Sequence, residues 1–135
     1  MKLKTPHLKE YYLIATQEKK YTLFPKGLEV YFYRNDPKDE GFLKANWAAF
    51  SEEIQIYKAK GEVLIQNAQG DELKTSCIFW DRKKKKIYTY VESHIKRANG
   101  SVLHAKNGLE GSEDLRNILL RNVDGHISLP EKIPL

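Results

Sequence analysis

The side chains best able to do chemistry are four histidines, and their spacing predicts neither a catalytic site nor a metal site. His7, His94, His104 and His126 are scattered along the sequence. They form no HExxH motif and no pair at i and i+4, and no carboxylate cluster has the spacing of metal ligands. His94 and His104 fall on predicted outward-facing strand positions, where solvent-exposed histidines are the expected outcome.

The single cysteine, Cys77, favours packing over chemistry. It lies in an apolar segment without a nearby basic partner in the sequence, so we expect a small buried side chain rather than a nucleophile. One cysteine excludes an intrachain disulfide framework and any site built from several thiolates. The phosphate-binding glycine motifs GxGxxG and GxxxxGK[ST] are missing as well. We therefore expect a protein that is not an enzyme and has no cofactor.

Length and composition indicate one soluble globular domain. The chain has 135 residues, of which 41% are apolar and 30% are charged. Its 23 basic and 18 acidic residues give a net charge of +5, which is compatible with an anionic partner without requiring one. No apolar run approaches the roughly 20 residues of a membrane-spanning helix. We expect an arm or edge segment over residues 1–23 and the domain proper over residues 24–135.

Regular turn signals predict an all-β domain. Most of them are separated by about 8 to 12 residues, a spacing typical of β-sandwiches and barrels. The segments between them are rich in the β-branched and aromatic residues that suit a half-buried strand. The turn signals fall at 35–37, 51–53, 60–61, 67–71, 81–85, 99–100, 107–108 and 124–125.

Helical periodicity competes with this prediction in two stretches, and the second consists of Leu115, Ile118 and Leu119. Five apolar residues have the spacing of a helix face: Leu43, Trp47, Phe50, Ile54 and Tyr57. An internal repeat favours strands instead, because similar tripeptides begin at Leu43, Leu73 and Leu103, 30 residues apart. Units of this size cannot bury an apolar face alone, so neighbouring units must stack.

Strand alternation then predicts one apolar inner face and one basic, solvent-exposed outer face. Lys44, Lys74 and His104 are expected to point outward. An apolar interior suits acyl chains, whose burial contributes about 0.8 kcal/mol per CH₂. The inner-face residues that we expect to contact lipid are Trp47, Val63, Ile65, Leu73, Cys77, Phe79 and Ile95.

Several motifs in order resemble the LptC family of periplasmic lipopolysaccharide-export proteins, particularly the versions from Bacteroides-type bacteria. They are Phe24-Pro-Lys-Gly-Leu-Glu-Val30, the Gly-x-Val and Asn-x-x-Gly elements of 61–75, Phe79-Trp-Asp81, Lys86-Ile-Tyr-Thr89 and Asn122-Val-Asp-Gly125. The resemblance covers roughly residues 24–128, and the stretch 61–88 is its most specific part.

This resemblance implies an open, twisted β-jelly roll of stacked antiparallel strands. It implies a non-enzymatic protein that receives lipopolysaccharide, with its lipid A part, from an inner-membrane ABC transporter and passes it to the bridge protein LptA. It also implies a periplasmic location, with an N-terminal membrane anchor that this sequence does not contain. We expect the last strand to be the edge that docks LptA, with Leu119, Arg121, Val123 and Ile127 as its contact residues.

Two alternatives remain open at the level of sequence. One is an LptA-like bridge protein that assembles end to end. The other is a nucleic-acid-binding β-protein, suggested by Lys83 to Lys86 and by the tyrosines of the segment 86–90. We rank it lower and expect no nucleic-acid partner, because the pattern does not place these aromatics on one short solvent-facing strip.

Overall fold

The computed structural model describes residues 2–4, 12–15, 20–33, 40–122 and 127–130, and over these ranges the chain forms strands and turns without a helix. The predicted all-β fold is confirmed, and residues 52–55 form a turn rather than part of a helix. The strands are β1 (Lys2–Lys4), β2 (Tyr12–Ala15), β3 (Lys20–Phe24), β4 (Leu28–Tyr33), β5 (Glu40–Ala45), β6 (Trp47–Ser51), β7 (Ile56–Gln66), β8 (Glu72–Asp81), β9 (Lys86–Thr89), β10 (Ser93–Lys96), β11 (Val102–Ala105), β12 (Leu109–Ser112), β13 (Ile118–Arg121) and β14 (Ile127–Pro130).

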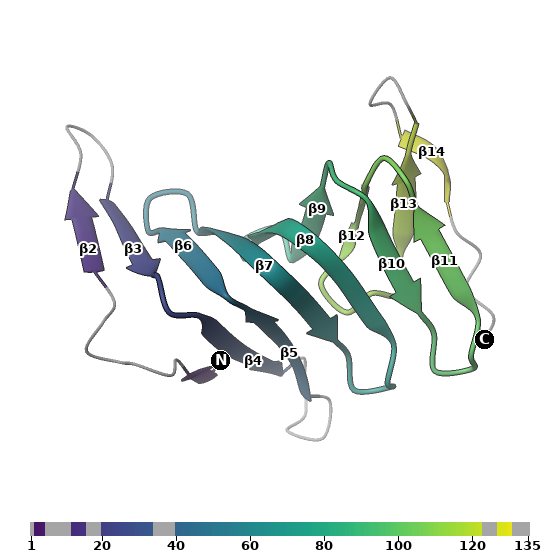
Figure 1. The fold of residues 1–135 in the computed structure, drawn as a ribbon, viewed down its shortest axis with the longest axis horizontal. Helices are drawn as coiled ribbons and strands as arrows, with labels where there is room; N and C mark the ends of the chain where they lie inside the picture. Colours follow the sequence, from purple (N-terminus) through teal and green to yellow (C-terminus); the bar gives the residue numbers. More distant parts are fainter. Residues whose placement is uncertain (1, 5–11, 16–19, 34–39, 123–126, 131–135) are drawn as a thin grey trace.

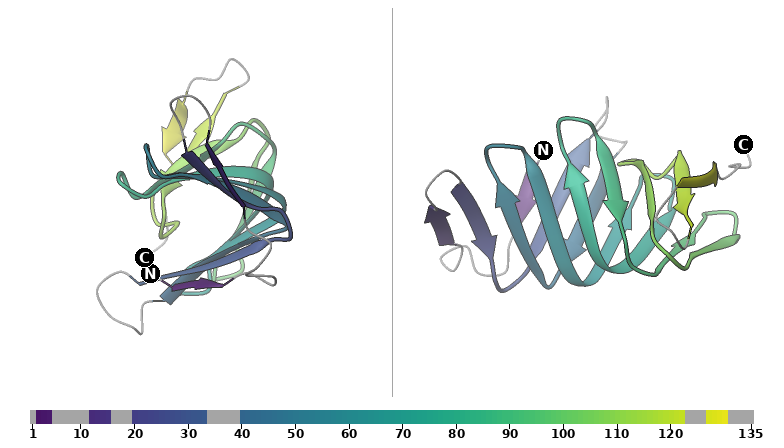
Figure 2. Two further views of the ribbon diagram at one scale, coloured as in Figure 1. Left: turned by 90° about the vertical axis from the view of Figure 1, so that its left-hand side faces the viewer. Right: turned by 90° about the horizontal axis from the view of Figure 1, so that it is seen from above.

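The strands form one open antiparallel sheet that is folded into two walls (Figure 1). The first wall has the order β1-β4-β5-β7-β8-β10-β11, and the second has the order β2-β3-β6-β7-β8-β9-β12-β13-β14. Seen from the end, the walls meet along one side, the corner, and separate toward the other side, the mouth (Figure 2). The sheet does not close into a barrel, which agrees with the predicted open jelly roll.

The two long strands β7 and β8 belong to both walls and carry the fold around the corner. Their register shifts between Lys60 and Val63, where Gly61 and Glu62 lie opposite the single residue Ser76. Both bulged residues have positive φ angles, 78° at Gly61 and 47° at Glu62. A bulge of this kind bends and twists a strand, so it turns β7 from one wall into the other.

The bends at the corner explain an error in the sequence prediction. Alternation predicts Trp47, Cys77 and Phe79 on the inner face, and all three assignments are wrong. After Ala45 the next buried residue is Ala48, and after Thr75 it is Ile78, so each bend shifts the inward phase by one residue. Trp47, Cys77 and Phe79 are half-buried and carry their side chains on the outer surface of the second wall.

Buried hydroxyl groups satisfy the backbone where β8 bends. The carbonyl oxygen of Cys77 accepts hydrogen bonds from Thr89 Oγ1 at 2.6 Å and from Thr75 Oγ1 at 3.3 Å. Ser93 Oγ donates to Thr75 Oγ1 at 2.9 Å and is fully buried. Unpaired buried carbonyls are costly, so these hydroxyls stabilise a bend that ladder bonds alone would leave unsatisfied.

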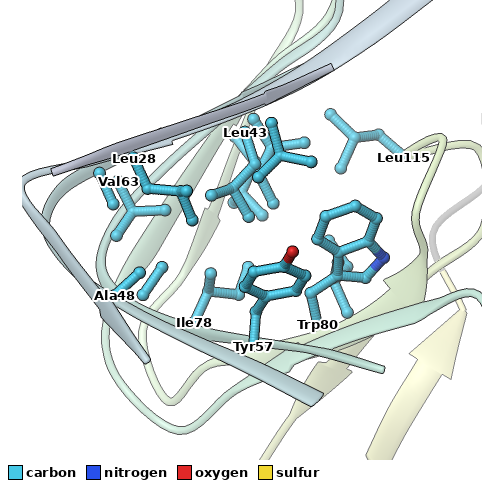
Figure 3. Packing of buried hydrophobic residues seen from close by; sticks show 14 of the residues in the cluster. Leu28, Leu43, Ala48, Tyr57, Val63, Ile78, Trp80 and Leu115 are labelled. Carbon is cyan, nitrogen blue, oxygen red and sulfur yellow. The ribbon is translucent and has the colours of Figure 1, made fainter. Parts of the chain in front are cut away.

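The core fills the space between the walls. Directly paired residues of neighbouring strands form an aliphatic row on the first wall: Val30, Leu43, Ile65, Leu73, Ile95 and Leu103. In Figure 3 Leu28, Leu43 and Val63 face Ala48, Ile78, Tyr57 and Trp80 of the second wall. Each cross-strand pair fixes the register, because a slip of one residue would expose the whole row.

Over each 30-residue repeat the chain passes from the first wall around the corner into the second wall and returns to the first. Leu43, Leu73 and Leu103 all lie in the first wall, on β5, β8 and β11. The arm of residues 1–23 contributes β1 to the first wall, and β2 and most of β3 to the second. Within the described part of the chain, no helix is long and apolar enough to cross a membrane.

Candidate functional site

The apolar interior is the candidate site, and four of the residues predicted to contact lipid line it. Val63, Ile65, Leu73 and Ile95 are at most 1% exposed. Their predicted inward orientation is confirmed, whereas contact with lipid stays a prediction. Their side chains belong to the packed core, so a long ligand would have to enter by separating the two walls.

A loop that crosses the mouth covers the interior. Residues 113–117, here called the closing loop, connect β12 to β13 at the mouth edge of the second wall. Leu115 in this loop is 0% exposed, and Figure 3 shows its side chain pointing into the space between the walls. Its φ of 64° lies in the left-handed region, which costs a leucine about 1 to 2 kcal/mol. Contacts around the loop must outweigh this strain.

Polar contacts hold the closing loop against the first wall. Asn67 Nδ2 donates to the carbonyl oxygen of Asp114 at 2.8 Å, and Arg97 Nη1 donates to that of Leu115 at 2.5 Å. Arg97 is 3% exposed and lies 3.6 Å from a carboxylate oxygen of Asp71. We call Asn67, Asp71, Arg97 and Asp114 the mouth cluster. Because Arg97 and Asp114 are both buried charged residues, their pairing is needed for stability.

The closing loop is also fastened to its own wall. Trp80 Nε1 donates to Glu113 Oε2 at 2.8 Å, and the amide of Glu113 donates to the carbonyl oxygen of Lys85 at 3.0 Å. The loop therefore lies beside the basic turn 82–85. Lys83, Lys84 and Lys85 of this turn are exposed. The mouth thus combines an apolar interior with a basic turn at one edge.

The mouth cluster makes stability depend on pH through Asp71. Burial alone would raise the pKa of Asp71, but hydrogen bonds from Asn67 and Ala98 and the charges of Arg97 and Arg116 outweigh it and lower the pKa. A carboxyl with a lowered folded-state pKa stabilises the fold above its unfolded pKa, about 3.9. This contribution is lost as the pH falls through the folded-state value.

We expect Asp71→Asn to lower the free energy of unfolding by about 1.5 to 3 kcal/mol at pH 7. The difference in melting temperature from the wild type should be largest near pH 7 and should narrow below about pH 4. Circular dichroism melts at several pH values measure it, with Glu53→Gln on the exposed turn as the control. A difference that stays constant from pH 7 to pH 3 would contradict this role of Asp71.

The outer surface of the second wall carries an aromatic strip. Phe79 stacks on Tyr88 with ring centroids 5.1 Å apart, and Tyr90, which is 61% exposed, makes edge contacts with both rings. The expectation that these aromatics are not gathered on one solvent-facing strip is therefore wrong. However, Phe79 and Tyr88 cover each other, and the Arg121 guanidinium lies 4.2 Å from the Tyr90 ring centre. Phe79 and Tyr88 thus offer little free ring surface on which bases could stack, and the Arg121 guanidinium lies over the Tyr90 ring.

The predicted docking edge needs correction. Leu119 and Arg121 belong to β13, which pairs with β12 on one side and β14 on the other. Ile127 lies in the terminal strand β14, and Val123 lies outside the described residues. Toward the C-terminal end, the described edge strands are β11 in the first wall and β14 in the second.

Sequence analysis missed the closing loop and the mouth cluster. It identified 67–71 as a turn, but nothing local indicates that Asn67 bonds to Asp114, which is 47 positions away. It also treated the histidines as scattered, whereas His94 and His104 stack with ring centroids 4.6 Å apart. The sequence did contain a signal for this contact. His94 precedes the inward-facing Ile95 and His104 follows Leu103, so both histidines face outward on neighbouring strands.

These features define an open, two-walled antiparallel β-protein with an apolar interior. Its mouth is covered by the closing loop, and a basic turn lies beside that loop. Comparison of the chain with protein-family models and with curated proteins finds no match.

Proposed function

We propose that this protein is a non-enzymatic lipopolysaccharide carrier of the LptC type. In this role it accepts lipopolysaccharide from an inner-membrane ABC transporter and hands it to an LptA-like periplasmic protein. The protein then acts in the periplasm, at the inner membrane. The resemblance supplies the substrate and the partners, and the geometry supplies a mechanism.

One observation carries the proposal: among the described residues, no strand pairing joins the two walls across the mouth of the apolar interior. Among the described residues, strand pairing runs within each wall, and the walls share only β7 and β8. Opening at the mouth therefore requires the loss of packing and of the closing-loop contacts, while the backbone hydrogen bonds persist. Acyl chains in the interior would replace the lost apolar contacts, since their burial is non-directional.

The closing loop is the point of entry in this proposal. Displacing Leu115 uncovers the interior and relieves its left-handed backbone conformation. The neighbouring basic turn offers Lys83, Lys84 and Lys85 to the phosphates of lipid A. These lysines are better placed than Lys44 and Lys74, which lie on the outer face of the first wall.

Hand-over to a partner requires an unpaired strand edge. Among the described residues, β11 and β14 have such an edge at the C-terminal end of the two walls, and β1 and β2 have one at the other end. An incoming strand could extend either wall through backbone hydrogen bonds. This arrangement lets a partner strand dock at either end of the sheet.

Site-specific photo-crosslinking tests the lipid proposal. A photoreactive phenylalanine analogue of tyrosine size would replace Tyr57, which is 5% exposed in the interior between Phe50 and Trp80. We expect ultraviolet irradiation in the presence of lipopolysaccharide to yield a labelled adduct at this position. The matched control is the same analogue at Phe79, an aromatic on the outer face of the same wall.

We expect adduct formation at position 79 to be at least tenfold weaker than at position 57. Circular dichroism checks that both variants are folded. Equal labelling at the two positions would indicate surface adsorption, and no labelling at Tyr57 in a folded protein would contradict an interior lipid path.

The end-to-end bridge is the second candidate, and the free edges at both ends favour it. Such edges permit head-to-tail pairing of copies, which forms open filaments when the rotation does not close. If the molar mass measured by light scattering grows with protein concentration, the result would support the bridge. A molar mass independent of concentration would support the carrier role.

A further inference from the structure

Three potential metal ligands meet on the outer face of the first wall, away from the mouth. His94 on β10 and His104 on β11 are directly paired across the two strands, and their rings are stacked at an angle of 9°. Glu92, just before β10, places Oε2 2.7 Å from Nε2 of His104. One ligand atom from each residue lies within 4.8 Å of the other two.

We propose that Glu92, His94 and His104 bind a divalent transition-metal ion, with Zn²⁺ as the best chemical match. Two imidazoles and one carboxylate form a ligand set that zinc accepts, with a fourth position left for water or another donor. Bond lengths of about 2.0 to 2.2 Å place the ligand atoms of one zinc ion roughly 3.3 Å apart. All three side chains are exposed, so small rotations suffice to bring their donor atoms to that separation.

The backbone already supplies most of the organisation that such a site needs. Directly opposed side chains of an antiparallel pair have Cβ atoms about 4.5 to 5.5 Å apart, which fixes the distance between the two imidazoles. Among the described residues the His94 ring stacks on His104 and makes no hydrogen bond, so its nitrogens are available to a metal. The hairpin of β10 and β11 therefore places two of the three donors side by side in advance.

The position in the repeat strengthens the inference. His104 follows Leu103 as Lys44 follows Leu43 and Lys74 follows Leu73. A row of directly paired residues crosses the outer face of the first wall, and it ends in the two histidines: Lys44, Leu64, Lys74, His94 and His104. The third unit of the repeat thus has a metal-binding side chain where the first two have cations.

The surroundings set the affinity and suggest the fourth ligand. Lys74 is the direct neighbour of His94 on β8, and its charge opposes a bound cation. Glu92 and His94 also line a shallow hollow of about 810 Å³ that Lys44 and Lys74 border. An anion in this hollow would be held by both lysines and could complete the coordination of the metal.

A zinc titration of the purified full chain tests the site. At pH 7.5 in phosphate-free buffer, with a chromophoric chelator as competitor, we expect one Zn²⁺ per chain, or one per pair of chains if a second copy completes the site. His94→Gln, His104→Gln and Glu92→Gln should each weaken binding at least tenfold, since each removes a ligand. Because the three side chains are exposed, the variants should keep the wild-type melting temperature in EDTA.

Two control variants sharpen the result. Glu53→Gln, an exposed carboxylate on the 52–55 turn, should leave zinc affinity unchanged. Lys74→Gln should tighten binding severalfold, because it removes the neighbouring positive charge. Absence of binding at 100 µM Zn²⁺ would overturn the proposal. Unchanged affinity in the double variant His94→Gln/His104→Gln would overturn it too, because the metal would then bind elsewhere, for example at His7 or His126. Neither result depends on whether the interior carries lipid.

Discussion

The Ile78→Asp variant is expected to lose more than about 5 kcal/mol of folding free energy, whereas Phe79→Asp should lose only about 1 to 2 kcal/mol. Ile78 is 0% exposed on the inner face of β8. Its replacement removes a packed side chain and leaves a carboxylate without a partner in an apolar interior. Such a loss matches the whole stability of many domains of this size, so the variant should be largely unfolded at 25 °C.

Phe79 is the matched control because it is the next residue on the same strand and points outward. Its aspartate variant loses the stacking on Tyr88 but keeps its carboxylate at a half-buried surface near Lys58. Urea denaturation followed by circular dichroism measures both variants. A larger loss for Phe79→Asp than for Ile78→Asp would show that the bend in β8 does not shift the inward phase as described.

The second large effect is expected at Gly108, which lies at the corner between β11 and β12. Its φ is +90°, and a Cβ at this position would lie 2.2 Å from the carbonyl oxygen of Thr89. The obstructing atom belongs to the backbone of a buried strand and cannot move aside alone. Gly108→Ala therefore adds a steric clash to backbone strain, and we expect a total loss of about 2 to 5 kcal/mol.

Gly100 separates the two contributions. It has nearly the same φ, +91°, but a Cβ there would meet nothing within 4 Å. Gly100→Ala should therefore show the backbone strain alone, about 1 to 2 kcal/mol. Chemical denaturation of the two alanine variants gives the difference directly. Equal losses would mean that the backbone at the corner adjusts easily and that the close approach of the strands there is unimportant.

Sequence patterns predicted the elements well because their signals are local. Inward-facing residues such as Leu73 and Thr75 recur at every second position of a strand. This period of two follows from the pleat of a strand wherever one face is buried. Turn signals such as the Asn67-to-Asp71 segment depend only on neighbouring residues. The all-β class, the stacking of the 30-residue units and the inward orientation of Val63 and Ile65 could be obtained in this way.

The candidate site was predicted only in part, and the errors have a common cause. Trp47, Cys77 and Phe79 were placed inside because alternation was continued through Asn46 and Ser76, where the chain bends. At a bend the inward-facing positions shift by one residue. The place of the bend depends on how neighbouring strands cross the corner.

What the sequence determined by itself is therefore the class of fold, the repeat and the apolar and basic character of its faces. Only the tertiary structure decided which residues meet: Leu115 with the interior, Asn67 with Asp114, and Glu92 with His104. These contacts join positions that are distant in sequence or lie on different strands, and they depend on strand register and on the fold of the sheet at its corner. No short stretch of the sequence determines the strand register or the fold of the sheet, because burial of the whole core selects the pairing between strands.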